Sequence, residues 1–146
     1  MPVIRKILVP VDFSDASKNA AKYAAELGAQ LSSPAAPISI DFLHVWQLAG
    51  FATPSSELAK DTERQLRDEL EQFVVALGAK VPIRSHLRLG IPYQEVIQAA
   101  TDYQSDLVIM GTTGKSGLEH FLVGSVAERV VRAAPVPVVT VRFAKS

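Results

Sequence analysis

The pattern of apolar and polar positions divides the chain into five short apolar runs separated by four longer amphipathic stretches. The first run contains the continuous segment Ile7–Leu8–Val9, which is typical of a strand with both sheet faces covered by helices. The run at 83–89 alternates in part between apolar and polar positions. We therefore predict strands at 4–11, 38–46, 83–89, 106–110 and 136–141.

The amphipathic stretches repeat apolar residues every three or four positions, as one face of a helix requires. Ser14 offers an N-cap hydroxyl before the first stretch, and Gly78 follows the second, where glycine commonly ends a helix. Pro92 suits the first turn of the third. The predicted apolar faces comprise Ala16, Ala20, Tyr23, Ala24, Leu27 and Leu31; Leu66, Leu70, Phe73 and Leu77; Tyr93, Val96, Ile97 and Ala100; and Val126, Val130 and Ala133.

This alternation of strand and helix predicts an α/β fold, an open, doubly wound, five-stranded parallel sheet with helices on both faces. By analogy with similar folds we expect the strand order 3-2-1-4-5. The length of 146 residues suits a single domain over residues 1–146. Ligands of such sheets lie beyond the carboxyl ends of the strands, where the order reverses. Here that point falls between the first and fourth strands.

A glycine-rich segment follows the fourth predicted strand, with Gly111 and Gly114 close together and Gly124 further on. Glycine lets a ligand approach the backbone closely. Ser125, with Glu128 three residues later, forms the pattern of a capping box, and free N–H groups at a helix start bind phosphate. A plain strand-to-helix turn with a capping serine fits the same residues, so the glycines alone leave both interpretations open.

Two charged residues accompany these loops. Lys115 can supply positive charge to a phosphate, although a lone lysine of this kind is more often a solvated side chain than a phosphate ligand. Asp12 follows the first strand, where its carboxylate suits either ribose hydroxyls or the positive end of a helix dipole. Gly114–Lys115–Ser116 looks like the end of a P-loop, but Ile109 stands where that motif has its first glycine.

Composition narrows the classes of function. The chain has 15 basic and 15 acidic residues, so it lacks the basic excess that nucleic-acid surfaces usually carry. No apolar run approaches the length of about 18 residues that a membrane span needs, and no signal peptide is evident. The absence of cysteine removes disulfides and thiolate chemistry. We therefore expect a cytoplasmic protein with no nucleic-acid or membrane partner.

Taken together, these residues resemble the universal stress protein family, specifically its ATP-binding branch. The resemblance extends over nearly the whole chain and includes the pattern G-x2-G-x9-G-[ST] from Gly111 to Ser125. It implies ATP as the ligand, with Mg²⁺ as a candidate companion whose ligands the sequence does not name. The implied binding residues are Pro10, Val11, Asp12, Val45, Met110, Gly111, Gly114, Lys115, Gly124, Ser125 and Val126.

The resemblance also implies what these residues do. Asp12 binds the ribose, Val45 and Met110 pack near the adenine, and the glycine segment wraps the ribose and phosphates largely through backbone N–H groups. The implied function is a nucleotide-dependent regulatory module of the stress response. A slow ATPase is an alternative. Hydrolysis needs ligands for a metal ion and positive charge on the γ-phosphate, and of these the motif supplies only the charge of Lys115. A carrier or interaction module for another ligand is a third possibility.

The fifth strand predicts how two copies associate. It is an edge strand rich in valine from Val136 to Val141, and an exposed apolar edge favours pairing with another chain. Pro137 suits an edge position. Members of the resembled family are usually dimers. We therefore expect a homodimer formed through this strand.

Overall fold

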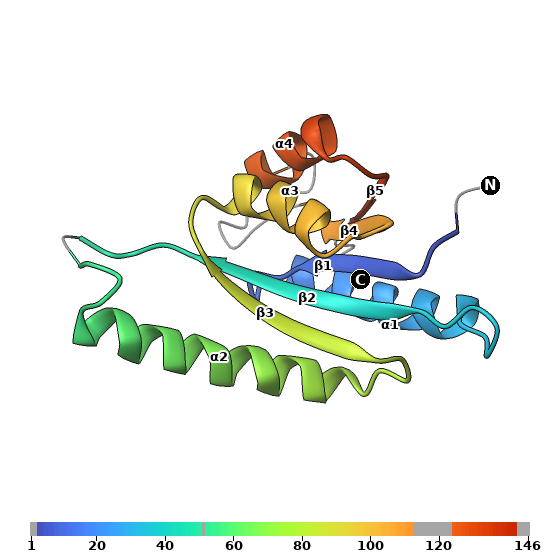
Figure 1. The fold of residues 1–146 in the computed structure, drawn as a ribbon, viewed down its shortest axis with the longest axis horizontal. Helices are drawn as coiled ribbons and strands as arrows, with labels where there is room; N and C mark the ends of the chain where they lie inside the picture. Colours follow the sequence, from blue (N-terminus) through green and yellow to red (C-terminus); the bar gives the residue numbers. More distant parts are fainter. Residues whose placement is uncertain (1–2, 51, 113–123, 143–146) are drawn as a thin grey trace.

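The computed structural model describes residues 3–50, 52–112 and 124–142, over which strands and helices alternate as predicted (Figure 1). The strands are β1 (Lys6–Pro10), β2 (Ser39–Trp46), β3 (Ile83–Leu89), β4 (Leu107–Gly111) and β5 (Val138–Val141). The helices are α1 (Asp15–Leu31), α2 (Glu57–Leu77), α3 (Pro92–Asp102) and α4 (Ser125–Ala133). Among these described helices, none is both long enough and apolar enough to cross a membrane.

All five strands form one parallel sheet in the order β3-β2-β1-β4-β5, which confirms the predicted topology. β1 lies at the centre, where Ile7 pairs with Ile40 of β2 on one side and with Leu107 of β4 on the other. The chain therefore turns in opposite directions after β1 and β4. Their carboxyl ends lie side by side at the point where the strand order reverses.

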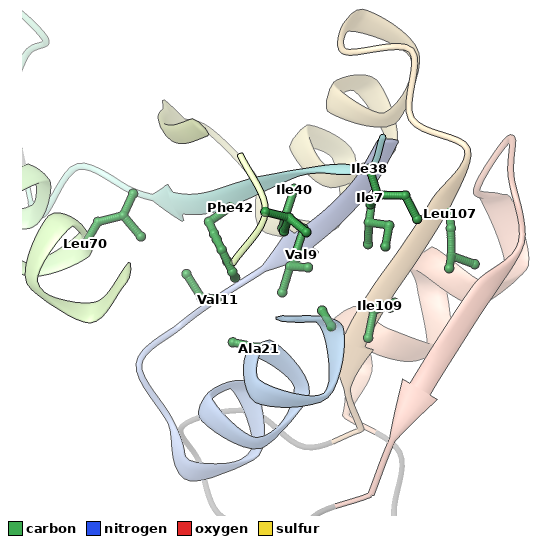
Figure 2. Packing of buried hydrophobic residues seen from close by; sticks show 12 residues of the cluster. Ile7, Val9, Val11, Ala21, Ile38, Ile40, Phe42, Leu70, Leu107 and Ile109 are labelled. Atoms are coloured by element: carbon green, nitrogen blue, oxygen red, sulfur yellow. The ribbon is translucent and has the colours of Figure 1, made fainter. Parts of the chain in front are cut away.

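Each face of the sheet packs against two helices. On one face, Phe42 of β2 shares a buried cluster with Ala21 of α1 and Leu70 of α2 (Figure 2). On the opposite face, Leu8 of β1 shares a second cluster with Val96 of α3 and with buried residues of α4. Because successive strand residues point to opposite faces, the central strands must be apolar at nearly every position. This arrangement explains the continuous apolar run in the first strand.

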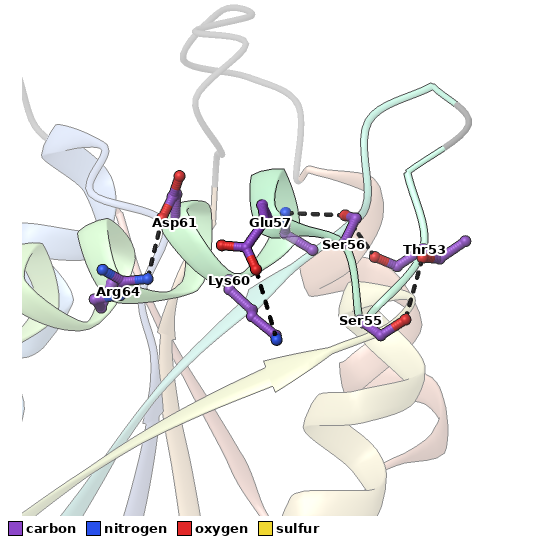
Figure 3. Close-up of polar contacts among 8 residues, drawn as sticks. Thr53, Ser55, Ser56, Glu57, Lys60, Asp61 and Arg64 are labelled. Carbon is purple, nitrogen blue, oxygen red and sulfur yellow. Dashed lines mark hydrogen bonds and ion pairs between the residues drawn. The ribbon is translucent and has the colours of Figure 1, made fainter.

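Side-chain caps fix where α1 and α2 begin. Ser14 is the N-cap of α1, as predicted, and its hydroxyl accepts a hydrogen bond from the backbone three residues further on. Ser56 caps α2 in the same way: its Oγ accepts from Ala59 N at 3.1 Å and donates to Thr53 O at 2.8 Å (Figure 3). α2 ends at Gly78, whose φ of 58° is a left-handed conformation that suits glycine.

The start of α4 differs from the prediction. Gly124 is the N-cap and Ser125 the first helical residue, because the carbonyl of Gly124 accepts the first helical hydrogen bond, from Glu128 N at 3.0 Å. The predicted capping box is therefore wrong, since it needs Ser125 one position earlier in the helix. The Glu128 carboxylate instead pairs with Arg132 at 2.9 Å. β5 is also shorter than predicted and begins at Val138.

Candidate functional site

A cleft of about 290 Å³ opens at the carboxyl ends of β1 and β4. The turn from β1 into α1 forms one side, and the beginning of α4 forms another. Segments of β2 and α3 complete its wall. The cleft lies where the strand order reverses, so the topological prediction and the observed hollow coincide.

Most of the binding residues inferred from the sequence line this cleft. They come from four separate parts of the chain, which the fold brings together. Gly114 and Lys115 lie outside the residues that the structure describes. The inferred residues that line the cleft are Pro10, Val11, Asp12, Val45, Met110, Gly111, Gly124, Ser125 and Val126.

The cleft has further lining residues that the sequence did not single out. Leu43, Pro92 and Val96 lie with Val45 and Met110 on the cleft wall. Their periodicity places them correctly on a strand and a helix, but periodicity cannot show that two such faces meet at a cleft. The additional polar residues are Ser17 and Thr112, both buried. Ala127 completes the set.

Asp12 stands in a turn that side chains hold on several sides. Its Oδ1 accepts a hydrogen bond from Ser14 N at 3.0 Å. Its own backbone N donates to Ser17 Oγ at 3.2 Å, and that hydroxyl donates to Ser14 O at 3.3 Å. Ser17 therefore ties the end of β1 to the first turn of α1. The carboxylate of Asp12 is half-buried and lies on the cleft wall.

The opposite side of the cleft is built from backbone. Within the described residues, no side chain caps α4. The N–H groups of Ser125, Val126 and Ala127 belong to the first turn, which has no intrahelical acceptors for them. All three residues line the cleft. Such a helix start carries about half a positive charge and suits an anionic ligand.

Gly111 has a structural requirement of its own. A Cβ built at this position would lie 2.9 Å from both the carbonyl carbon and the carbonyl oxygen of Ala16. Backbone atoms cannot move away as a flexible side chain can, so the glycine lets α1 pack closely on β4. The sequence suggested close approach of a ligand here, and the structure adds close packing between two elements.

A network of charged and aromatic groups lies on the α3 side of the sheet without lining the cleft. Arg88 donates to Glu95 at 2.9 Å and to Asp102 at 3.1 Å. Burial by itself lowers the pKa of Arg88, but hydrogen bonds to Tyr103 and Asp102 outweigh it and raise that pKa above its usual value. Hydrogen bonds from Gln98 and Arg88 lower the pKa of the Asp102 carboxyl. These contacts fasten α3 to β3.

Comparison with known proteins identifies the class to which this fold and cleft belong. Residues 4–142 match the universal stress protein family. The chain is 34% identical over 146 residues to the universal stress protein MJ0531 of Methanocaldococcus jannaschii, a match that covers 97% of this chain and 84% of that relative. The chain therefore belongs to the universal stress protein family.

Solved structures share the fold. The universal stress protein UspA from Lactobacillus plantarum superposes with a TM-score of 0.77 at 28% identity, covering 96% of this chain and 99% of that one. A universal stress protein in complex with cAMP gives 0.71 at 21% identity, with coverages of 96% and 98%. A family member from Arabidopsis thaliana with AMP bound gives 0.63 at 23%, with coverages of 96% and 93%. The last two of these structures therefore hold an adenine nucleotide in the same fold.

Proposed function

We propose that this protein binds ATP in the cleft and acts as a nucleotide-dependent regulatory module. The observation that carries the proposal is the meeting of three surfaces in one cleft: an apolar wall, the carboxylate of Asp12, and the first turn of α4, which no described side chain caps. These three surfaces suit an adenine base, a ribose and a phosphate chain, in that order. The nucleotides bound by two fold relatives support the same ligand class.

The apolar wall is the proposed adenine site. Leu43 and Val45 of β2, Val96 of α3 and Met110 of β4 offer aliphatic and thioether surface to a flat aromatic ring. Met110 is suited to this role because its sulfur is polarisable and packs favourably against rings. Adenine is therefore held chiefly by burial, which alone discriminates weakly between purines.

Asp12 is the proposed ribose ligand. A carboxylate can accept about four hydrogen bonds, so one from Ser14 N is compatible with further bonds from ribose hydroxyls. The side-chain contacts of the turn fix its position before a ligand arrives, which reduces the entropy lost on binding. The two roles that the sequence left open for Asp12 are therefore compatible in this proposal: the carboxylate can hold the start of α1 and bind the ribose as well.

The first turn of α4 is the proposed phosphate site, reached by backbone N–H groups rather than by side chains. Among the described residues, no three His, Asp or Glu side chains gather into a metal-binding group. Mg²⁺ commonly binds through one or two carboxylates together with substrate phosphates and water. A magnesium ion arriving with ATP would therefore rely on the phosphates and water, since Asp12 is assigned to the ribose.

Mass spectrometry of the small molecules released when the purified protein is denatured tests the ligand. We expect ATP at close to one equivalent per chain. ADP in its place would indicate turnover and favour the slow ATPase. A different compound would favour a carrier of another ligand.

We propose the cytoplasm as the compartment of this protein. ATP is available there, and a chain without cysteine is at no disadvantage in it.

We also propose a homodimer through β5, because the two edges of the sheet differ. The edge strand β3 carries Arg84 and Arg88, and charged side chains discourage pairing between edges. The edge strand β5 has the sequence Val-Val-Thr-Val and offers no such charge. Two copies of β5 related by a two-fold axis would pair this edge with itself.

A single substitution can test this dimer. Val108 N donates to Pro137 O, and Thr112 N donates to Val141 O. The backbone groups of Pro137 and Val141 therefore point toward β4, and by alternation the backbone N–H of Thr140 points away from β4, toward the open edge. Thr140→Pro removes an outward N–H while sparing the β4 ladder. We expect light scattering to give the mass of two chains for the unmodified protein and of one chain for the variant. A mass of one chain for the unmodified protein at micromolar concentration would rule out the dimer.

A further inference from the structure

His44 makes an unusual contact with the turn that carries Asp12. It lies on β2 between Leu43 and Val45, which line the cleft, so alternation directs its ring to the opposite face of the sheet. There its Nδ1 lies 2.8 Å from Val11 O. A carbonyl oxygen can only accept, so Nδ1 carries the proton and donates. A side chain thus binds the end of β1 where the strand leaves the sheet.

The ring of His44 also contacts Phe13. The two ring centroids are 4.6 Å apart, and Phe13 in turn meets Phe73 of α2 edge-on at 5.8 Å. Phe13 has a φ of 65°, which a bulky residue adopts at a cost of about 1–3 kcal/mol. Packing against His44 and Phe73 compensates for this conformation.

These two contacts hold both neighbours of Asp12. Val11 is bonded at both of its backbone groups, since its N–H donates to Leu43 O at 2.8 Å and its carbonyl accepts from His44. Phe13 is held by its ring on the far face of the sheet. The left-handed backbone at Phe13 lets successive side chains diverge, so that Asp12 lines the cleft while Phe13 packs behind it.

We propose that His44 is a positioning residue that sets nucleotide affinity by holding Asp12 in place from the opposite face of the sheet. The inference rests on the proposed binding of nucleotide at Asp12 and deepens it. The contact needs a hydrogen-bond donor one atom beyond Cγ and a flat ring face on the same side chain. Histidine supplies both, whereas asparagine supplies the donor and phenylalanine supplies the ring.

Three variants separate these contributions. His44→Ala removes both contacts, and we expect it to weaken binding of ATP and of adenosine by about tenfold each, because one partly buried hydrogen bond and one ring contact are lost. His44→Asn and His44→Phe each keep one contact and should fall between His44→Ala and the unmodified protein. Isothermal titration at a temperature where every variant is folded gives the affinities. Equal affinities for all four proteins would overturn the proposal.

A matched control comes from the neighbouring strand. His86 of β3 also combines one hydrogen bond, Nε2 to Asp41 at 2.8 Å, with one ring contact, to Tyr103 at 4.1 Å. It does not line the cleft or contact the Asp12 turn in the described structure. We expect His86→Ala to change nucleotide affinity less than twofold. A loss equal to that of His44→Ala would show a general effect of removing a sheet histidine and would contradict the proposal.

A double-mutant cycle separates positioning from general structural damage. In an Asp12→Ala background, His44 has no carboxylate to position, so adding His44→Ala should change affinity less than twofold. A further tenfold loss in that background would mean that His44 acts by another route, and the proposal would fail.

Hydrogen exchange of the nucleotide-free protein tests the contact without any ligand. His44→Ala should speed exchange at the amides of Asp12 and Ser14, which donate to Ser17 Oγ and Asp12 Oδ1, by about tenfold relative to amides of α2. Unchanged exchange would refute the positioning role. If the unmodified protein binds no nucleotide but exchange responds as expected, the proposed function fails while the role of His44 in holding the turn stands.

Discussion

The two turns that border the cleft are constructed in different ways. The turn from β1 to α1 is held by side chains, with Ser14, Ser17 and His44 each bonded to its backbone. The described ends of the β4 to α4 connection are held by backbone: Thr112 N donates to Val141 O, and Gly124 N donates to Thr112 O. Replacing one of these side chains should therefore disturb the turn from β1 to α1. The connection from β4 to α4 should instead be disturbed by replacing a glycine with a residue that has a Cβ.

This difference matches the parts of a nucleotide that each turn is proposed to bind. A ribose presents hydroxyl donors in a fixed arrangement, which a positioned carboxylate can recognise. A phosphate chain presents acceptor oxygens in many directions, which several backbone N–H groups can bind without a specific side chain. The following predictions test this division, from the largest expected effect to the smallest.

Gly111→Ala should have the largest effect, on stability. Its Cβ would lie 2.9 Å from backbone atoms of Ala16, so α1 must shift from β4 at a cost of about 3 kcal/mol in the free energy of unfolding. Urea denaturation measures this. Gly28→Ala is the control, because its Cβ would make an ordinary contact of 3.4 Å with Ile40 and should stabilise α1 by about 0.5–1 kcal/mol. Equal midpoints for the two variants would refute the packing argument.

Gly124→Val should have the next largest effect, on binding. Gly124 has φ −59° and ψ 153°, a conformation open to any residue, so the fold should survive. The branched side chain would obstruct the phosphates at the start of α4 and lower ATP affinity by about thirtyfold, or about 2 kcal/mol. Titration calorimetry gives the affinity. Unchanged affinity would show that the phosphates lie elsewhere.

Asp12→Ala should weaken binding of ATP and adenosine by similar factors of about tenfold, because the ribose is common to both and a hydrogen bond to a charged group is lost. Competition binding with the two ligands compares the losses directly. A selective loss for ATP would instead place Asp12 on a metal ion or a phosphate.

Ser14→Ala should have the smallest effect, removing an N-cap at a cost of about 1 kcal/mol in unfolding free energy. Because Ser14 also donates its backbone N to Asp12 Oδ1, and that N–H survives the substitution, nucleotide affinity should fall less than threefold. Thermal unfolding with and without ATP separates the two quantities. A larger loss of affinity than of stability would assign the hydroxyl a direct role in binding.

The fold could be predicted from the sequence because its signals are local and repeated. Continuous apolar runs such as that around Leu8 identify doubly covered strands, and the alternation with helices fixes a parallel sheet. The ends of elements were less predictable. Ser125 and Glu128 have the spacing of a capping box, but the preceding glycine takes the N-cap position, which depends on backbone geometry rather than residue type.

The site was predictable where it follows from motif and topology, and not where it depends on contacts across the sheet. Asp12, Gly111 and Gly124 flank the point where the strand order reverses. Ser17 was missed because a serine in a helix gives no sign that its hydroxyl bonds back to the preceding turn. His44 was missed because its partner, Val11 O, is distant in sequence and belongs to the backbone.

Titration of nucleotide-free protein with ATP, AMP and cAMP by isothermal calorimetry tests the central claim most directly. We predict one nucleotide per chain, with ATP at least tenfold tighter than AMP or cAMP because its longer phosphate chain reaches more N–H groups of α4. No binding of ATP at millimolar concentration, or equal affinities for all three nucleotides, would contradict the proposed ATP site.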